Sequence, residues 1–471
     1  MSENILTRNN PFKQTTSTTG SSANNILSKY INWDNYQLPL IFLFSLLSLN
    51  YFNMKLLKFV VQYFLDKSVI NIKSTKVTDP TERSIRMLCE STVSSSSPLS
   101  STVFFEGPVQ LGFINLEGEA VWFGESEMPA LNMKAGGPME LELPLHVIFK
   151  DTKKFGEFTK LLMLKKSLKM VMKGFVTVRM LGFLKVRGAV MNKTIEIKGM
   201  DGLNQVSIKD VIVKKGDRSK VEIAVSCKMT NVSDISMALD QVWFNMYYKD
   251  SQVGTVSITP LSLVPGVNSP PTRVFFHPDP NNPKAIEMGR ELMSNFTKGT
   301  DSETTIKGNH PNKQLPSYFA EGLSGLNITT TLNGLDIPLL KSAKMSISPL
   351  DLVVSMAAFS VPTRLMTTNP FDEDFYIIKI NSEAIIKGVN IGSLVADHSS
   401  YPIKIARRTT VETGLMTMKL NPLVEGFGAV ATTLGEGNMS ADIKATIDAK
   451  VGNYNMVIDY EQKQVPVIVG L

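Results

Sequence analysis

An internal repeat is the feature of this 471-residue chain that most constrains its fold. Three pairs of residues are each separated by 138 positions: Asn231 and Asn369, Gly254 and Gly392, and Cys89 and Cys227. A constant offset over several landmarks indicates that one structural unit is repeated along the chain. Beyond residue 65 the chain has room for three such units of about 135 residues each.

Each unit is expected to consist of short strands and one helix. Apolar and polar residues alternate between Val221 and Cys227, which is typical of a half-buried strand. Lys249-Asp250-Ser251 and Lys387-Gly388 are predicted hairpin turns. Asn282-Pro283 supplies an N-cap and first residue for a helix, as does Asn421-Pro422 one repeat later, and Asp151 is the expected cap of the earliest helix.

The fold class predicted from these patterns is all-β. We expect three tandem antiparallel β-sandwich domains, each with one short helix, over residues 66–200, 201–335 and 336–471. An extended solenoid is the alternative, but solenoid repeats are much shorter, about 20 to 45 residues.

The first 65 residues differ from the rest. Residues 1–37 are rich in Ser, Thr and Asn and are predicted to form a disordered tail. Residues 38–65 are predicted to form a transmembrane or juxtamembrane helix, since no charge occurs between Leu38 and Met54 and Lys55 and Lys58 can extend to the interface. A signal segment and a buried helix of a soluble protein are the alternatives. Lysines are more frequent after the span than before it, which favours a cytosolic body.

Composition excludes several classes of function. The 49 Lys and Arg against 43 Asp and Glu leave a net charge of +6 spread along the chain, which gives no reason to expect nucleic acid as a partner. Two Cys and four scattered His do not make a metal site, and no phosphate-binding glycine loop is present. The carboxylates of Asp372, Glu373 and Asp374 are interpreted as a solvated turn rather than a calcium site. We therefore expect no enzyme, catalytic residue, metal or cofactor.

Two groups of residues are candidate contacts with lipid. The chain has 24 Met, whose flexible side chains suit irregular apolar surfaces, and residues 352–359 are apolar on both faces. Candidate lipid-contacting residues there are Val354, Met356, Ala358 and Phe359. The earliest helix is surrounded by lysines, of which Lys153, Lys154, Lys165 and Lys166 are candidate membrane-surface contacts. Ordinary core packing explains the first group equally, and a helix that covers the core with solvated lysines explains the second.

The motifs resemble two known families. Asn369-Pro370-Phe371, followed by a hairpin and Asn390-Ile391-Gly392, resembles the late-embryogenesis-abundant group 2 domain. Thr78-Asp79-Pro80-Thr81 and the stretch from Lys198 to Leu203 are similar to a fungal membrane-protein family that carries a large domain of unknown function. The resemblance covers residues 59–471, and the family includes a vacuolar-membrane protein named for terminating autophagy.

The resemblance implies a single-pass protein of the fungal vacuole membrane with a lumenal body that binds or transfers lipid. Five sequons, at Asn192, Asn231, Asn295, Asn327 and Asn438, are compatible with a lumenal body. Membrane lipids and other vacuolar membrane proteins are the expected partners, and the resemblance supplies no catalytic residue. The alternative function is a lumenal scaffold that regulates autophagy or the vacuolar proton pump.

Overall fold

The computed structural model describes residues 53–346, 360–421 and 439–470, which form mostly strands. The chain divides into two compact units, residues 1–63 and 64–471. Residues 53–67 are helical, and among the described residues no helix is both long and apolar enough to cross a bilayer. The predicted tail over residues 1–37 and most of the predicted span over residues 38–65 lie outside the described residues. The predicted predominance of strands is confirmed.

The first sheet contains nine strands from the region before residue 200 and two from beyond it. The nine are β1 (Val69–Thr78), β2 (Ser84–Ser94), β3 (Ser101–Phe105), β4 (Val109–Ile114), β5 (Ala120–Ser126), β6 (Leu131–Met133), β7 (Pro138–Phe149), β8 (Ser167–Met180) and β9 (Leu184–Lys198). The two others are β12 (Ile235–Leu239), which pairs in parallel with β1, and β15 (Leu261–Leu263). A sheet of one copy is thus extended by strands of the next, across the expected border at residue 200.

The second sheet contains eight strands between residues 206 and 332. They are β10 (Val206–Gly216), β11 (Val221–Asn231), β13 (Val242–Tyr248), β14 (Ser251–Ile258), β16 (Gly266–Asn268), β17 (Pro271–Phe276), β18 (Ser302–Lys307) and β19 (Asn327–Leu332).

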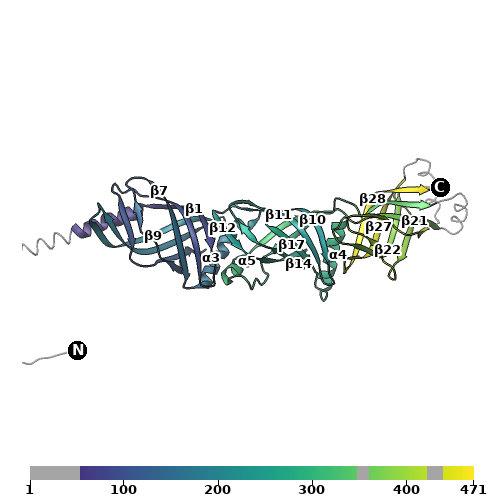
Figure 1. Cartoon of the computed structure of the whole chain (residues 1–471), viewed down its shortest axis with the longest axis horizontal. Helices are drawn as coiled ribbons and strands as arrows, with labels where there is room; N and C mark the ends of the chain where they lie inside the picture. The colour runs from purple at the N-terminus through teal and green to yellow at the C-terminus, as the bar shows by residue number, and fades with distance from the viewer. Residues whose placement is uncertain (1–52, 347–359, 422–438, 471) are drawn as a thin grey trace, which may run out of the picture. The chain divides into compact units, whose positions relative to one another are not determined.

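The third sheet contains nine strands between residues 340 and 470 (Figure 1). They are β20 (Leu340–Ser346), β21 (Ser360–Thr368), β22 (Phe375–Ile386), β23 (Val389–Asp397), β24 (Ile403–Ile405), β25 (Thr410–Glu412), β26 (Met416–Leu420), β27 (Met439–Val451) and β28 (Tyr454–Gly470). Because β20 pairs with both β21 and β28, this sheet closes on itself.

Seven strands follow the same order in all three sheets. The orders are β1-β2-β7-β5-β4-β8-β9, β10-β11-β17-β14-β13-β18-β19 and β20-β21-β26-β23-β22-β27-β28. In the third sheet the first and last of these strands are hydrogen-bonded in parallel. In the first two sheets the corresponding strands approach within 8 Å between Cα atoms, and the described residues form no ladder there. Each copy is therefore built on one curled sheet rather than on two separate sheets, which refines the predicted sandwich.

The helices follow equivalent strands. Helix α3 (Thr152–Leu164) comes after β7, with Asp151 as its N-cap, and α4 (Pro283–Thr297) comes after β17, with Asn282 as its N-cap. Both caps were predicted. The third predicted helix, after Asn421, lies outside the described residues. The second region has an additional helix, α5 (Ser317–Ser324), so the expectation of one helix per copy was wrong there.

The two asparagine landmarks have the same structural role in the second and third copies. Asn231 and Asn369 are both buried, and each accepts from the amide two residues later and donates to the carbonyl four residues later. The two donor distances from Nδ2 are both 2.8 Å. The 138-residue offset therefore marks one loop geometry used twice.

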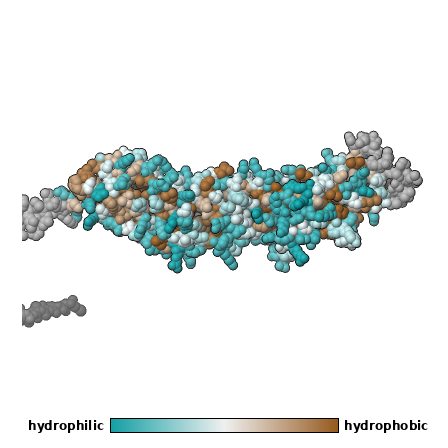
Figure 2. All heavy atoms as spheres, in the orientation of Figure 1, coloured by the Kyte–Doolittle hydropathy of each residue, from teal (hydrophilic) through white to brown (hydrophobic). Residues whose placement is uncertain are grey.

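Figure 2 shows hydrophilic residues over much of the visible face, with hydrophobic residues scattered among them. The apolar residues of the strands are therefore turned mainly to the inside of the sheets, as the alternating burial of strands such as β7 requires.

Candidate functional site

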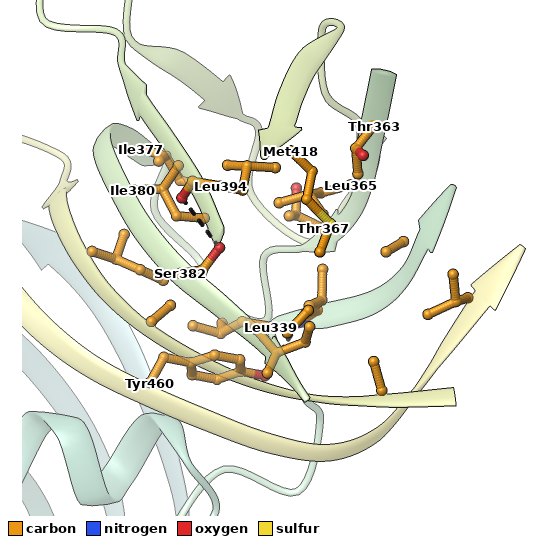
Figure 3. A pocket seen from close by; sticks show the side chains of 18 of the residues that line it. Leu339, Thr363, Leu365, Thr367, Ile377, Ile380, Ser382, Leu394, Met418 and Tyr460 are labelled. Atoms are coloured by element: carbon orange, nitrogen blue, oxygen red, sulfur yellow. Dashed lines mark hydrogen bonds between the residues drawn. The ribbon is translucent and has the colours of Figure 1, made fainter. Parts of the chain in front are cut away.

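The interior of the closed third sheet contains an apolar cavity (Figure 3). Its empty volume is about 810 Å³, with the open space at its mouth included. Strands alternate side chains between their two faces, so each strand contributes every second residue to the interior. Figure 3 shows Leu365 of β21, Ile380 of β22 and Met418 of β26 turned toward this space. The small side chains of Ala343, Ala384 and Ala445 help to leave the space empty.

The polar side chains that line the third-sheet cavity have partners at its wall. Ser382 Oγ donates to the carbonyl of Leu394 at 3.4 Å. Tyr460 Oη donates to Gln462 and accepts from the amide of Leu340 at 3.3 Å. Burial raises the pKa of Tyr460, so its hydroxyl stays neutral at ordinary pH. In the described part of the chain no charged side chain lines this cavity, which fits an apolar ligand and not an ionic one.

A second apolar cavity lies inside the first sheet, with an empty volume of about 1200 Å³ including its open side. Its described lining again contains no charged side chain. Methionine is unusually frequent in it, since the lining includes Met87, Met128, Met170, Met172, Met191 and Met237. Thioether side chains adapt to different neighbours. The sequence shows that Met is abundant. It does not show that several Met side chains gather around this cavity.

Helices α3 and α5 cover one end of the first-sheet cavity. Phe155 and Phe158 of α3 line it together with Phe319 of α5. The ring of Phe155 stacks on Phe149 at 4.1 Å and meets the edge of Tyr318 at 4.9 Å, measured between centroids. Aromatic pairs of this kind add to the stabilisation from buried area. The apolar face of α3 is thus occupied by the core.

Among the described residues, β1 and β9 approach each other without forming a hydrogen-bonded ladder, and we call this line of the first sheet the seam. Ile70 and Ile72 of β1 and Ile195 and Ile197 of β9 line the cavity from its two sides. Lys193 lies in the inward-facing row of β9, between Met191 and Ile195, and is buried. Its Nζ donates to the carbonyls of Leu65, Asp66 and Ser68, at 3.1 Å for Asp66 and 2.6 Å for Ser68.

Lys193 therefore caps the end of the helix over residues 53–67. A cation at a helix C-terminus satisfies carbonyls that have no partner inside the helix. Burial lowers the pKa of Lys193, and the charge of Asp66 opposes that shift. Pattern analysis missed this residue, since a lysine in a strand is ordinarily expected on the outward face.

The structure places the predicted membrane-surface lysines at the α3 end of the first sheet. Lys153 and Lys154 are exposed on α3, whereas Lys165 is its C-cap and Lys166 follows in the loop before β8. Lys154 lies 3.9 Å from Asp151 and Lys166 lies 3.9 Å from Asp201, in salt bridges. Contact of these four lysines with a membrane stays a prediction.

The predicted lipid-contacting residues Val354, Met356, Ala358 and Phe359 lie outside the described residues. Their segment connects β20 to β21, and both strands line the third-sheet cavity.

The other side chains considered in the sequence analysis also have partners in the structure. Asp372 accepts from Lys214 at 2.5 Å and from Arg408 at 2.6 Å, and Asp374 pairs with Lys404 at 2.7 Å. His277 is hydrogen-bonded to Thr255, and the ring of His310 stacks on Trp243. Over residues 53–346, 360–421 and 439–470 no cluster of three His, Cys, Asp or Glu could hold a metal ion. Cys89 and Cys227 are both free and buried.

The fold and cavities define a β-rich protein with repeated curled sheets and apolar interiors. Residues 123–246 match the model of a family described as "Protein of unknown function (DUF3712)". The match begins in β5 and ends in β13, so it spans parts of the first two copies. No curated protein matches the chain.

Two solved structures give weak similarities. The CupB6 tip adhesin of Pseudomonas aeruginosa is 8% identical over 45% of this chain and 90% of its own, with a TM-score of 0.15. Dimeric latent PorU of Porphyromonas gingivalis is 9% identical over 86% of this chain and 34% of its own, with a TM-score of 0.11. At these scores neither bears on fold or function.

Proposed function

We propose that this chain is a membrane-anchored, non-enzymatic protein that binds the acyl chains of lipids inside its first and third sheets. The observation that carries the proposal is the pair of cavities. Their described linings are apolar and contain no charged side chain. Small-molecule binding sites in proteins are lined mainly by apolar side chains. A polar substrate would lose its hydrogen bonds to water in such an interior, whereas an acyl chain loses none.

The two sheets differ in how a lipid would enter. The third sheet is closed by hydrogen bonds between β20 and β28, so a ligand enters it from an end. In the described first sheet the equivalent strands, β1 and β9, form no ladder. The seam between them gives a lateral path for an acyl chain while the headgroup stays in water. Exchange of lipid at the first sheet and slower release from the third are therefore proposed.

The resemblance to fungal vacuolar-membrane proteins adds a location to the proposal. Residence in that membrane, with a lumenal body, accords with residues 38–65 as an anchor and with exposed sequon asparagines at Asn192 and Asn327. Asn231 is buried and hydrogen-bonded, so glycosylation is expected at the exposed sequons and not there. Removal of glycans by a glycosidase, read as a mobility shift, tests the lumenal location.

Lipid extraction from the purified full chain, followed by mass spectrometry, tests the binding function. Ala384→Leu with Ala445→Leu fills the third-sheet cavity, and Met172→Trp fills the first. Each is expected to remove part of the bound lipid. Ala238→Leu, at an exposed position of β12, is the matched control and is expected to leave lipid content unchanged. A chain that copurifies with no lipid and takes none from vesicles contradicts the proposal and favours the scaffold alternative.

A further inference from the structure

The hairpin that joins β8 to β9 has an exposed apolar tip. Leu181 and Phe183 form this tip with Gly182 between them, and their exposed fractions are 58% and 78%. Met180 and Leu184 are the last paired residues before the turn. Exposed apolar side chains that occur singly need no explanation, but two at one hairpin tip indicate a contact with another apolar phase or surface.

Three cations surround the hairpin tip. Arg179 precedes it on β8, and Lys185 and Arg187 follow on β9. The guanidinium of Arg179 lies 4.9 Å from the ring centre of Phe104. Within the part of the chain that the structure describes, no salt bridge involves these three cations. The carboxylate of Glu106, which faces the same two strands, accepts from Thr177 Oγ1 at 2.7 Å and from the amide of Gly188 at 2.9 Å.

The same strand is joined to the end of the predicted membrane segment. Lys193 of β9 donates to the carbonyls of Leu65 and Asp66, where residues 38–65 end. The tip lies at the opposite end of β8 from Lys165 and Lys166, because β8 begins at Ser167 and ends at Met180. Fourteen residues of strand span about 43 Å. The hairpin is thus a separate surface from the lysines around α3.

We propose that the β8–β9 hairpin is a membrane-docking site that inserts Leu181 and Phe183 among the lipids of an anionic bilayer. The pattern of apolar tip and cationic flanks matches the acyl region and the headgroups of such a bilayer. A docked tip would hold the first sheet and its seam beside the membrane from which lipid is taken. This inference rests on the membrane anchoring in the proposed function, but it is independent of whether the cavities hold lipid.

Fluorescence of the full chain in vesicles tests the docking site. An environment-sensitive bimane label is attached to F183C, and a matched label is attached to L116C on the β4–β5 turn. Leu116 is 78% exposed, the same fraction as Phe183, and its turn lies near the α3 end of β8 because Phe113 pairs with Met170. Unlabelled background is measured on the unsubstituted chain, whose Cys89 and Cys227 are buried.

The proposal predicts that lipid-borne quenchers reduce emission from residue 183 about twofold or more in anionic vesicles and leave residue 116 unchanged. The effect should weaken at high salt and in the triple variant R179Q, K185Q and R187Q, because the attraction to anionic lipid is screened or removed. Equal, water-like emission from both labels at every lipid composition would overturn the proposal. The hairpin tip would then be interpreted as a contact for a protein partner. Copurified lipid is measured on the same samples, so loss of cavity binding is recognised separately.

Discussion

At the residue scale, three glycines explain how strands pair closely before α3, before α4 and, in the third copy, before residue 421. A Cβ at Gly254 would lie 2.2 Å from the carbonyl oxygen of Phe275, and one at Gly392 would lie 2.2 Å from that of Lys419. Gly124 has the same relation to Ile148, at 2.6 Å. Only a residue without a side chain allows this approach of two backbones.

Replacement of one of these glycines is expected to destabilise the chain. Gly254→Ala places a methyl group against backbone that cannot move without breaking the β14–β17 ladder, at a cost of about 1–3 kcal/mol. Gly414→Ala is the control, since a Cβ at that residue would have no described atom within 4 Å and its φ is not in the left-handed region. Urea unfolding compares the two; equal midpoints for both variants would show that the close approach is not a constraint.

The repeat revealed two of the three glycines from sequence alone. Gly254 and Gly392 keep the 138-residue offset, but Gly124 does not, because 35 positions separate it from Cys89 and only 27 separate Gly254 from Cys227. Each interval contains one further strand, β3 in the first copy and β12 in the second, but the connections between the strands are longer in the first copy. An insertion shifts the offset without changing the local geometry, so a fixed spacing could not find the third position.

At the element scale, turns and caps were predictable because their signals are local. Lys249-Asp250 and Lys387-Gly388 have positive φ at both residues, as two-residue hairpins require, and Asn282 and Asp151 cap their helices. The parallel pairing of β1 with β12 and the packing of α3 on α5 join residues of different copies. Such contacts depend on tertiary arrangement and have no local sequence signal.

Lys193 provides a test of how the element β9 is joined to the helix end over residues 65–68. Lys193→Met keeps the apolar stem but removes the ammonium donor. The carbonyl of Leu65 still accepts from the hydroxyl and the amide of Ser68. The expected loss of about 1–3 kcal/mol therefore comes from the carbonyls of Asp66 and Ser68, which lose this donor. Lys173→Met on β8 is the control, because that side chain is exposed. Thermal unfolding compares the stability of the two variants. A Lys193 variant as stable as the control would mean that these hydrogen bonds contribute nothing to the stability of the fold.

At the scale of the whole molecule, ionised carboxylates link the second and third copies. Asp372 of the third region pairs with Lys214 of β10, and Asp459 of β28 pairs with Arg290 of α4. Hydrogen bonds from these cations hold the pKa of both carboxyls below the ordinary value of 3.8. Asp397 has a pKa lowered to about 2 by the hydroxyl and amide of Ser399 and by Lys379.

Acid is therefore expected to destabilise the chain in a defined window. A carboxyl with a lowered folded pKa contributes stability that is complete above its unfolded value and is lost as pH falls through the folded value. The melting temperature should fall as pH is lowered from about 4 toward 2. Asp372→Asn with Asp459→Asn should flatten this dependence; a profile as steep as that of the unsubstituted chain would exclude these two pairs as its source.

The central claim is that acyl chains occupy the interiors of the first and third sheets. A lipid with a photoactivatable group in its acyl chain, mixed with the full chain in vesicles and irradiated, reports their position through the labelled peptides. We predict labels on the inward-facing residues around Met172 and Met191 in the first sheet and around Met418 in the third. Labels confined to residues 38–65 and the β8–β9 hairpin, with none in either interior, would contradict the account.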